Sequence, residues 1–518
     1  MGTSKKVTLS VDAAAGRHAI SPLVYGVNFG SQTSGLNKVL NIPVDRWGGN
    51  STSRYNYTNG FTNTGADWYF ENVVSDQSLT GFVDADRSTG TKSLVTVPMI
   101  GWVAKNGSAT EHPFTCSFPK AAFPVQDGFD HWDPDCGTGT RNGTDLTADP
   151  STTSTQVGSG FDQAMVASLV SRYGTAASGG VGFYELDNEP VIWNSTHRDV
   201  HPDPLTASEL REKSLDTAKA IKAADPSAAV LGPSDWGWCA YYFSGAQDCG
   251  QAVDADVNGA EPLGVWYLKQ FAAAQQSSGA RLLDYFDEHF YPQAPGVALG
   301  RAGSAATQAL RLRSTRSLWD PSYVDESWIG TDVGAEPLAW IRTMKAWVNA
   351  SYPGTRTAIT EYNFGGLESV NGALAQADVL GIFGREGLDL ATLWAPEKTS
   401  EPWAYAFRMY RNYDGRRHTF GDLSVKASSS NQGRLAAYAA TRSSDGALTV
   451  VVINKTHAKI TSRLSLKNFA GRTRAAVYRY SSAHKTSIRK LASAKVHAGR
   501  VTLTYPASSI SLLVLPKR

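Results

Sequence analysis

The sequence predicts an α/β fold in which a (β/α)8 TIM barrel is accompanied by a second, smaller all-β sandwich domain. The chain has 518 residues, which is more than one ordinary hydrophobic core organises. Up to about residue 418 short β-like segments alternate with helical segments, and from about residue 420 alternating β segments replace them. We therefore expect a barrel over residues 20–418 and an antiparallel β-sandwich built from residues 1–19 and 419–518.

Eight β-like segments supply the predicted barrel strands. They are residues 24–30, 44–50, 95–101, 181–189, 229–234, 285–291, 358–364 and 390–396. Most of them precede a helical segment, and the clearest helical segments are residues 161–173, 207–224, 264–275, 336–350 and 374–384. This alternation is typical of a closed parallel barrel. A doubly wound open sheet is the alternative, but no Gly-x-Gly-x-x-Gly turn follows the first strand.

The C-terminal part of the chain is typical of a small antiparallel sandwich. Its alternating segments, separated by short turns, are residues 434–442, 448–454, 460–466, 474–480 and 501–515. Residues 7–14 at the other end of the chain alternate in the same way. We expect this N-terminal strand to join the sandwich, which makes that domain discontinuous.

Composition excludes several classes of function. The chain has 49 Lys and Arg residues against 47 Asp and Glu residues and no long basic run, so no nucleic-acid partner is predicted. No apolar stretch reaches about 18 residues, so no membrane-spanning helix is predicted. The first residues contain no apolar segment after their lysines, so no signal peptide is predicted there. We expect a monomer that binds neither membranes nor nucleic acid.

The cysteines fall into two local pairs, Cys116 with Cys136 and Cys239 with Cys249. An even number with local pairing predicts two disulfides in a secreted protein, and buried free thiols are the alternative. Zinc is not expected, because no Cys-x-x-Cys occurs. The first pair lies in a connection of about sixty residues after the third strand, which is long for a compact domain. In a barrel this connection would wall the active face.

Two glutamates lie at barrel strand ends, where the functional residues of this fold gather. Glu189 ends the fourth strand directly before Pro190, and Glu361 ends the seventh strand. Desolvation there would raise the pKa of Glu189, as a general acid requires, whereas a solvated turn residue is the alternative. Two carboxylates that flank one bond are what glycoside hydrolysis needs, and a separation of about 5–5.5 Å is that of a retaining enzyme.

Four polar residues at the same strand ends are predicted to support these glutamates. Asn188 is placed to hydrogen-bond a sugar 2-hydroxyl, with a turn residue as the alternative. Arg46 is expected to keep Glu361 ionised, and a structural ion pair is the alternative. His289 and Tyr291 end the sixth strand and are expected to orient the nucleophile, and a hydrogen-bonded core histidine is the alternative for His289.

Aromatic side chains near the strand ends offer flat faces to sugar rings. Pyranose rings present apolar C–H faces that stack on indole and phenol rings. Trp394, Trp68 and Tyr69 are the expected platforms, and core packing is the alternative for each tryptophan.

The chemistry expected from these residues requires no cofactor and no metal. Residues 254–259 imitate the start of a calcium loop, but Val265 stands where the loop needs Glu. A structural Ca²⁺ at this segment therefore stays an open alternative. No phosphate loop and no His-Glu-x-x-His motif occurs in the sequence.

Four motifs in order resemble glycoside hydrolase family 44. They are Arg46-Trp47-Gly48-Gly49-Asn50, Asp67-Trp68-Tyr69-Phe70-Glu71-Asn72, Tyr184-Glu185-Leu186-Asp187-Asn188-Glu189-Pro190 and Thr360-Glu361-Tyr362-Asn363. The resemblance implies a barrel with a β-sandwich and a retaining endo-β-1,4-glucanase or xyloglucanase activity on β-glucan or xyloglucan chains. Carried over by motif, it implies Glu189 as the acid/base and Glu361 as the nucleophile. The four motifs do not include the long cysteine-containing connection, so the resemblance implies nothing about its shape.

Two other functions are compatible with the same residues. An arabinofuranosidase-like exo enzyme with a barrel and a sandwich predicts a pocket closed by loops, whereas endo cleavage predicts an open groove. A non-catalytic glycan-binding protein predicts that the two carboxylates lie far apart or are held in ion pairs.

Overall fold

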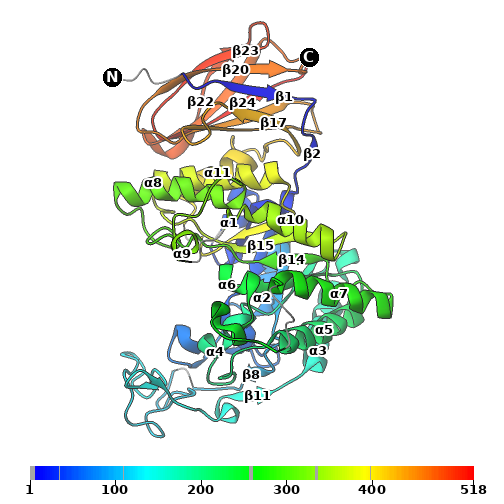
Figure 1. Ribbon diagram of the computed structural model, residues 1–518, viewed down its shortest axis with the longest axis vertical. Coiled ribbons are helices and arrows are strands. Elements are labelled where there is room, and N and C mark those ends of the chain that lie inside the picture. Colours follow the sequence, from blue (N-terminus) through cyan, green and yellow to red (C-terminus); the bar gives the residue numbers. More distant parts are fainter. Residues whose placement is uncertain (1–5, 34, 109, 256–260, 333–335, 397) are drawn as a thin grey trace. The chain divides into compact units, whose positions relative to one another are not determined.

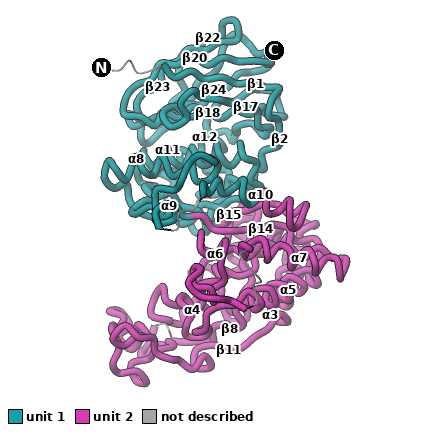
Figure 2. Tube along the Cα trace, in the orientation of Figure 1, with its two compact units in different colours: residues 1–43, 291–344, 361–518 teal, residues 44–290, 345–360 magenta. Residues whose placement is uncertain are grey.

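The computed structural model describes residues 6–33, 35–108, 110–255, 261–332, 336–396 and 398–518 (Figure 1). The chain divides into two compact units (Figure 2). Unit 1 comprises residues 1–43, 291–344 and 361–518, and unit 2 comprises residues 44–290 and 345–360. Most of the segment that imitates a calcium loop, residues 256–259, lies outside the described residues.

Eight parallel strands form a closed barrel, which confirms the predicted fold class. Their order around the barrel is β12, β13, β14, β15, β16, β3, β4 and β7. Their bounds are β3 Gly26–Asn28, β4 Val44–Trp47, β7 Lys92–Val97, β12 Phe183–Leu186, β13 Ala229–Asp235, β14 Tyr285–Glu288, β15 Arg356–Tyr362 and β16 Leu390–Leu393. Nearly all of their residues are buried, because helices cover the outside of such a barrel and side chains fill its interior.

Seven of the eight barrel strands end earlier than the sequence suggested, and β12 and β14 are the two that matter for the site. β12 ends at Leu186 and β14 ends at Glu288, so Glu189 and His289 lie in the turns that follow. Glu189 has a φ of +46°, a left-handed conformation outside the extended region of regular strands. β15, in contrast, includes Glu361.

The predicted helical segments correspond to five long helices. They are α3 Ser159–Tyr173, α5 Ala207–Ala224, α7 Leu263–Ser278, α10 Trp340–Ser351 and α11 Val370–Glu386. Thr206 and Ser369 accept backbone N–H groups at the starts of α5 and α11, which replaces hydrogen bonds that a helix N-terminus lacks. The remaining α-helices are α1 Leu36–Leu40, α2 Leu79–Thr89, α4 Trp193–Thr196, α6 Trp238–Tyr242, α8 Ala305–Ser314, α9 Trp328–Thr331 and α12 Pro402–Arg411.

The second domain is a ten-stranded, mostly antiparallel sheet in unit 1. Its strands are β1 Leu9–Asp12, β2 His18–Ala19, β17 Leu423–Ser429, β18 Leu435–Thr441, β19 Leu448–Asn454, β20 Ile460–Lys467, β21 Arg474–Ser481, β22 His484–Lys495, β23 Arg500–Tyr505 and β24 Ser509–Leu515. β1 pairs antiparallel with β17 and parallel with β20, so the N-terminal strand joins this domain as expected. Alternate residues of β1 and of the C-terminal strands meet in one buried cluster that includes Val11, Val450 and Leu464.

The connection between β7 and α3 is an ordered structure in unit 2. It contains β8 Trp102–Ala104 and β11 Ser154–Gln156, which pair antiparallel, and the short hairpin of β9 Thr140–Arg141 with β10 Thr144–Asp145. The hairpin of β5 Phe61–Asn63 and β6 Asn72–Val74 precedes it in the same unit. In the described part of the chain, no helix is long and apolar enough to cross a membrane.

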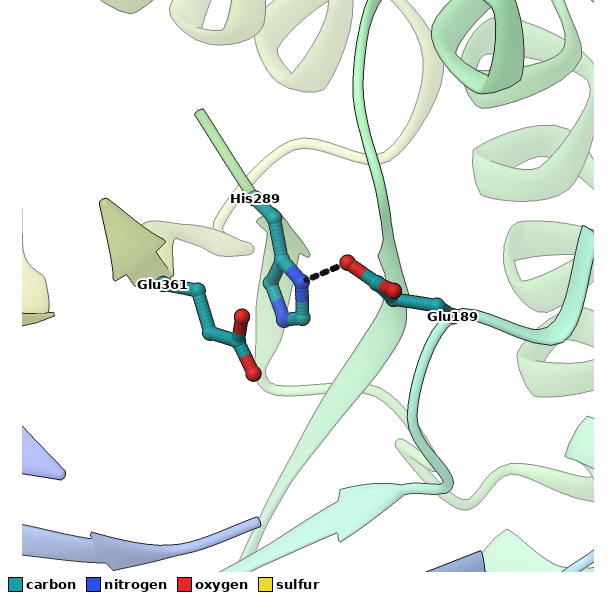
Figure 3. Close-up of side chains that lie close together, drawn as sticks. All are labelled: Glu189, His289 and Glu361. Atoms are coloured by element: carbon teal, nitrogen blue, oxygen red, sulfur yellow. Dashed lines mark hydrogen bonds and ion pairs between the residues drawn. The ribbon is translucent and has the colours of Figure 1, made fainter. Parts of the chain in front are cut away.

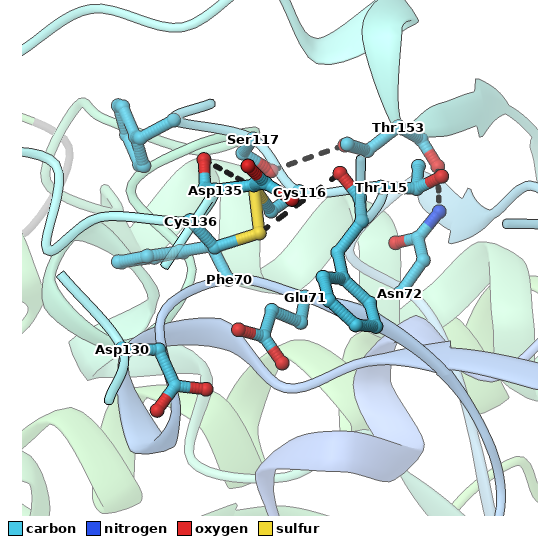
Figure 4. Close-up of a disulfide and its surroundings, with 12 residues drawn as sticks. Phe70, Glu71, Asn72, Thr115, Cys116, Ser117, Asp130, Asp135, Cys136 and Thr153 are labelled. Atoms are coloured by element: carbon cyan, nitrogen blue, oxygen red, sulfur yellow. Dashed lines mark hydrogen bonds between the residues drawn. A yellow bond between two sulfur atoms is a disulfide. The ribbon is translucent and has the colours of Figure 1, made fainter. Parts of the chain in front are cut away.

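Both expected cysteine pairs form disulfides. Cys116 and Cys136 are bonded within the long connection (Figure 4), and Cys239 and Cys249 are bonded near α6. The first disulfide is buried beside Phe114 and Tyr69. A covalent link between loop segments that contribute little regular structure limits their conformations in the unfolded chain as well as in the folded one.

Candidate active site

Glu189 lies in a tight turn after β12 that several hydrogen bonds hold in place. Asp187, with a φ of +63°, accepts the backbone N–H of Ile100 at 2.9 Å and the hydroxyl of Ser53. The backbone N–H of Glu189 donates to the carbonyl of Ser234 at 3.0 Å. Non-glycine residues with positive φ are costly and persist where surrounding bonds hold them, often at functional sites. The turn therefore fixes the direction in which the Glu189 side chain leaves the backbone.

Burial and neighbouring charges set the protonation of Glu189. Burial raises the pKa of the Glu189 carboxyl to about 7, opposed by Arg46 and reinforced by the negative charges of Asp67 and Glu185. Its side chain is 15% exposed. His289 Nδ1 lies 2.8 Å from Glu189 Oε1, the contact drawn as a dashed line in Figure 3. A carboxyl group in this setting exchanges a proton near neutral pH.

Glu361 is held by unit 1. Its residue is buried at the end of β15, and the Tyr291 hydroxyl donates to Glu361 Oε2 at 2.7 Å. The Asn363 amide donates to the Trp394 carbonyl at 3.0 Å, and Trp394 N–H donates to the Tyr362 carbonyl at 3.1 Å. Tyr291 thus contacts the residue that it was expected to orient, and Trp394 follows β16 beside the same strand end.

The structure brings the two glutamates together around one histidine. One oxygen from each carboxyl group of Glu189 and Glu361 and one ring nitrogen of His289 lie within 4.8 Å of one another (Figure 3). One hydrogen bond of His289 runs to Glu189, and its expected role in orienting Glu361 stays a prediction. Two carboxyl groups this close at the strand ends can reach the two sides of one bond.

Glu185 is a functional candidate that the sequence reasoning missed. It is fully buried on β12, and Arg46 Nε donates to both of its oxygens at 2.9 and 2.8 Å. Thr96 and Thr360 hydroxyls donate to it at 2.7 and 2.8 Å. Burial works to raise the pKa of Glu185, but the charges of Arg46 and His289 together with the hydrogen bonds from Arg46 and Thr96 outweigh it and hold that pKa below its usual range. The signal that the sequence offered for this ion pair was the presence of two opposite charges, Arg46 and Glu185, on two buried strands.

Arg46 also organises the residue next to the acid. Its second terminal nitrogen donates to Asn188 Oδ1 at 2.8 Å, and Gly49 N–H donates to the same oxygen at 3.1 Å. The alternative for Arg46 was a structural ion pair. Arg46 forms that pair with Glu185 and in addition donates a hydrogen bond to Asn188. Its predicted effect on Glu361 stays a prediction.

Removing Arg46 alone is expected to destabilise the fold strongly. Arg46→Met leaves Glu185 buried without its cation, which costs about 3–5 kcal/mol in unfolding free energy. The double variant Arg46→Met/Glu185→Gln is expected to recover most of that loss, because no unpaired charge remains. Urea unfolding followed by tryptophan fluorescence measures both values. Equal losses in the single and double variants would contradict an ion pair as the cause.

A polar chain in unit 2 links Asn188 to an aromatic patch. Asn188 Nδ2 donates to Asn50 Oδ1 at 3.0 Å, and Asn50 Nδ2 donates to both Asp67 oxygens at 3.2 and 3.1 Å. Trp68, the next residue, is 37% exposed and stacks on Trp132 with ring centroids 5.3 Å apart. The aromatic patch, defined as Trp68, Tyr69, His131 and Trp132, therefore connects with the acid through two asparagines.

Trp132 was not among the predicted platforms. It is 69% exposed, and an indole so exposed is unusual unless it has a partner. Its position in a connection without a recognisable motif gave the sequence reasoning no reason to single it out. Trp68 and Tyr69 were predicted, and both belong to the patch.

Comparison with known proteins identifies the family. The family model described as glycoside hydrolase family 44 matches residues 61–294. Endoglucanase A of Paenibacillus lautus is 34% identical over 472 residues, which cover 87% of this chain and 64% of that protein. The chain therefore spans less than two thirds of the length of this curated relative.

Two solved structures match over nearly the whole chain. CelM2, a bifunctional glucanase-xylanase protein from a metagenome library, is 44% identical with a TM-score of 0.94, and 99% of each chain is covered. A Paenibacillus polymyxa xyloglucanase of family 44, solved with xyloglucan, is 30% identical with a TM-score of 0.81, and 99% of this chain and 100% of that chain are covered. These matches over the barrel and the sandwich, together with the four motifs and the geometry of Glu189 and Glu361, establish that the chain belongs to glycoside hydrolase family 44.

Proposed function

We propose that this chain is a retaining endo-acting glycoside hydrolase that cleaves β-1,4-glucosidic bonds in cellulosic β-glucan or xyloglucan. The observation that carries the proposal is the pair of carboxyl groups with different environments. Glu189 has a pKa raised to about 7, and Glu361 accepts a hydrogen bond from Tyr291. Acid catalysis and nucleophilic attack together require two carboxyl groups that flank one bond and lie in different environments.

In the first step a Glu361 oxygen attacks the anomeric carbon. The bond from that carbon to the leaving oxygen breaks, its electron pair stays on the oxygen, and Glu189 supplies the proton that the oxygen takes up. A covalent glycosyl ester on Glu361 results. The Tyr291 hydroxyl holds the attacking carboxylate in one rotamer, which reduces the entropy that must be lost in the transition state.

In the second step water hydrolyses the glycosyl ester. Glu189, now ionised, removes a proton from water while the water oxygen bonds to the anomeric carbon and Glu361 leaves as a carboxylate. His289 fixes the Glu189 carboxyl through both steps. The amide oxygen of Asn188 accepts hydrogen bonds from Arg46 and Gly49, and one amide N–H donates to Asn50. The second amide N–H donates to the 2-hydroxyl of the sugar.

The chemistry of the surrounding surface supports a polymeric glucan as the substrate. Trp68 and Trp132 expose their stacked indoles, Trp394 follows β16 and is half-buried, and indoles bind pyranose faces. The relatives are named as an endoglucanase, a glucanase-xylanase and a xyloglucanase. We further propose an exported protein, because two disulfides are typical of oxidising compartments.

Product analysis tests this proposal. Cellulosic and xyloglucan oligosaccharides are incubated with the protein, and ¹H NMR follows the first anomer released. Double displacement predicts the β-anomer first, with mutarotation to the α-anomer later, and internal cleavage of the chain. An α-anomer released first would contradict Glu361 as a nucleophile, and no cleavage of either substrate would overturn the glucanase assignment.

The pH profile of kcat/KM is expected to fall on the alkaline side of about pH 7. Glu189 has a pKa near 7 in the folded protein, so its protonated, acid form is lost as pH rises through that value. Each pH unit above it should lower kcat/KM on a natural oligosaccharide about tenfold. An aryl glycoside whose leaving group needs no proton should lack this alkaline limb when glycosylation limits kcat/KM. A flat profile from pH 6 to 9 on both substrates would contradict the assigned acid.

A further inference from the structure

A second group of carboxylates lies beneath the Cys116–Cys136 disulfide. It consists of Glu71, Asp130 and Asp133, and each offers one oxygen within 4.8 Å of the others. Figure 4 shows the Glu71 side chain directed toward Asp130 on the side of the disulfide. The proposed reaction uses none of these three residues.

The backbone around the disulfide fixes this carboxylate group. Glu71 and Cys116 form an antiparallel bridge, so the disulfide lies directly beside the segment that carries Glu71. Asp130 N–H donates to the Cys136 carbonyl at 2.9 Å, and Cys136 N–H donates to the Asp133 carbonyl at 3.0 Å. The crosslink thus ties all three carboxylates to one rigid frame.

The charges of this group are not balanced by protein cations. Glu71 is only 4% exposed, Asp130 is only 1% exposed, and Glu71 Oε1 is buried without a hydrogen-bond donor among the described residues. Within that described part, no Lys or Arg nitrogen lies within ion-pair distance of the three, and the exposed His131 ring is 3.4 Å from Asp130. A buried carboxylate oxygen without a donor is costly unless a cation or a shared proton occupies the space beside it.

The oxygen spacing fits a hard divalent cation. Calcium binds carboxylate oxygens at about 2.3–2.6 Å, so two ligands of one ion lie at most about 5 Å apart. The donor set contains only carboxylate oxygens, which favour Ca²⁺ or Mg²⁺ over zinc or copper. A carboxyl group must lose its proton to bind the ion, so the affinity for the cation should rise with pH.

Asp130 connects this group with the aromatic patch. Its Oδ2 accepts the Trp68 indole N–H at 3.0 Å, and its Oδ1 accepts the Trp132 backbone N–H at 3.1 Å. An ion that holds the Asp130 carboxylate in place therefore also holds the stacked indoles of Trp68 and Trp132 in place. Three mutually repelling carboxylates without an ion would loosen the same contacts.

We propose that Glu71, Asp130 and Asp133 bind one divalent cation, of the Ca²⁺ class, that holds the Trp68–Trp132 platform in place for a sugar ring. Water molecules complete the coordination shell of the ion. The cation takes no part in bond cleavage, so its loss affects binding of long substrates more than the chemical step. The binding claim stands without the proposed function, and only the role of the platform rests on it.

Calcium titration of the chelator-treated full chain tests the site. We expect one Ca²⁺ per chain by isothermal titration calorimetry at pH 7.5, and a higher Tm with CaCl2 than with chelator. Glu71→Gln should weaken that binding by at least about 10–100-fold, the cost already seen when second-sphere partners of metal ligands are removed. Asp133→Asn, at a more exposed position, gives a second variant with little risk of misfolding. Glu111→Gln changes the same charge on an exposed part of the same connection and should bind as wild type does.

Terbium luminescence locates the bound ion. Tb³⁺ at these carboxylates should be sensitised by tryptophan excitation, and Trp68→Phe should reduce the signal several-fold without preventing calcium binding. Glu71→Gln should raise KM on long glucan oligosaccharides at unchanged kcat on short ones. Wild-type calcium affinity in Glu71→Gln would overturn the site. Absence of any calcium uptake by the wild type would also overturn it and would indicate carboxylates that share a proton, and either result would leave a retained-anomer glucanase activity unaffected.

Discussion

Glu361→Gln is expected to reduce kcat on cellulosic oligosaccharides about 10⁴–10⁶-fold, the range found when a covalent nucleophile is removed. The amide has the shape of the carboxylate and still accepts the Tyr291 hydroxyl, so the fold should be unchanged. Without a negative oxygen, however, no glycosyl ester forms and the oxocarbenium-like transition state loses its counter-charge. Steady-state kinetics with reducing-end detection measure the loss.

A small external nucleophile distinguishes loss of the nucleophile from general damage. In Glu361→Ala, azide should enter the vacated space and attack an activated aryl β-glycoside, which yields the α-glycosyl azide. Glu212→Gln, an exposed change on α5, should keep wild-type activity and serves as the control for the assay. Turnover within tenfold of wild type in Glu361→Gln would disprove its role.

Glu189→Ala is expected to lower kcat/KM on oligosaccharides about 10²–10⁴-fold, the usual contribution of a general acid. The effect should depend on the leaving group. An aryl glycoside with an acidic phenol needs no protonation, so its glycosylation step should proceed nearly as in the wild type. Deglycosylation then becomes limiting, because the base that activates water is missing, and a burst of phenol should precede slow turnover.

Pre-steady-state absorbance measurements test this dependence. The burst amplitude should approach the enzyme concentration in Glu189→Ala and be absent from Glu361→Ala. The alkaline limb near pH 7 should disappear from the Glu189→Ala profile together with the group that produces it. Equal losses on natural and activated substrates would show that Glu189 acts in binding or folding and not as the acid.

Much of the architecture could be predicted from the sequence because it depends on local periodicity. Alternating and buried strand patterns gave all eight barrel strands, and the N-terminal strand β1 was expected to join the sandwich and does so. The first two helical connections are only weakly marked in the sequence, and α1, the helix of the first, has only five residues and forms little more than one turn. The domain bounds 20–418 and 419–518 stay a prediction, since the compact units divide the chain differently.

The site could be predicted only where a residue type and a strand end coincided. Glu189, Glu361 and Tyr291 were found in that way, and the structure brings the two glutamates close. Glu185 was missed because its role depends on Arg46, which lies 139 positions away. Glu71 was assigned to a motif without a chemical role, because its carboxylate partners come from a connection in which the sequence alone offered no motif to connect them with it.

By itself the sequence determined the order of strands and helices, the two cysteine pairs and the positions of the two proposed catalytic carboxyl groups. These features follow from side-chain periodicity and spacing along the chain, which act over a few residues. Only the tertiary structure decided that His289 binds Glu189, that Arg46 pairs with Glu185 and that burial raises the pKa of Glu189. The reason is physical: desolvation and Coulomb interactions depend on distances through space, and those distances exist only once the barrel has closed.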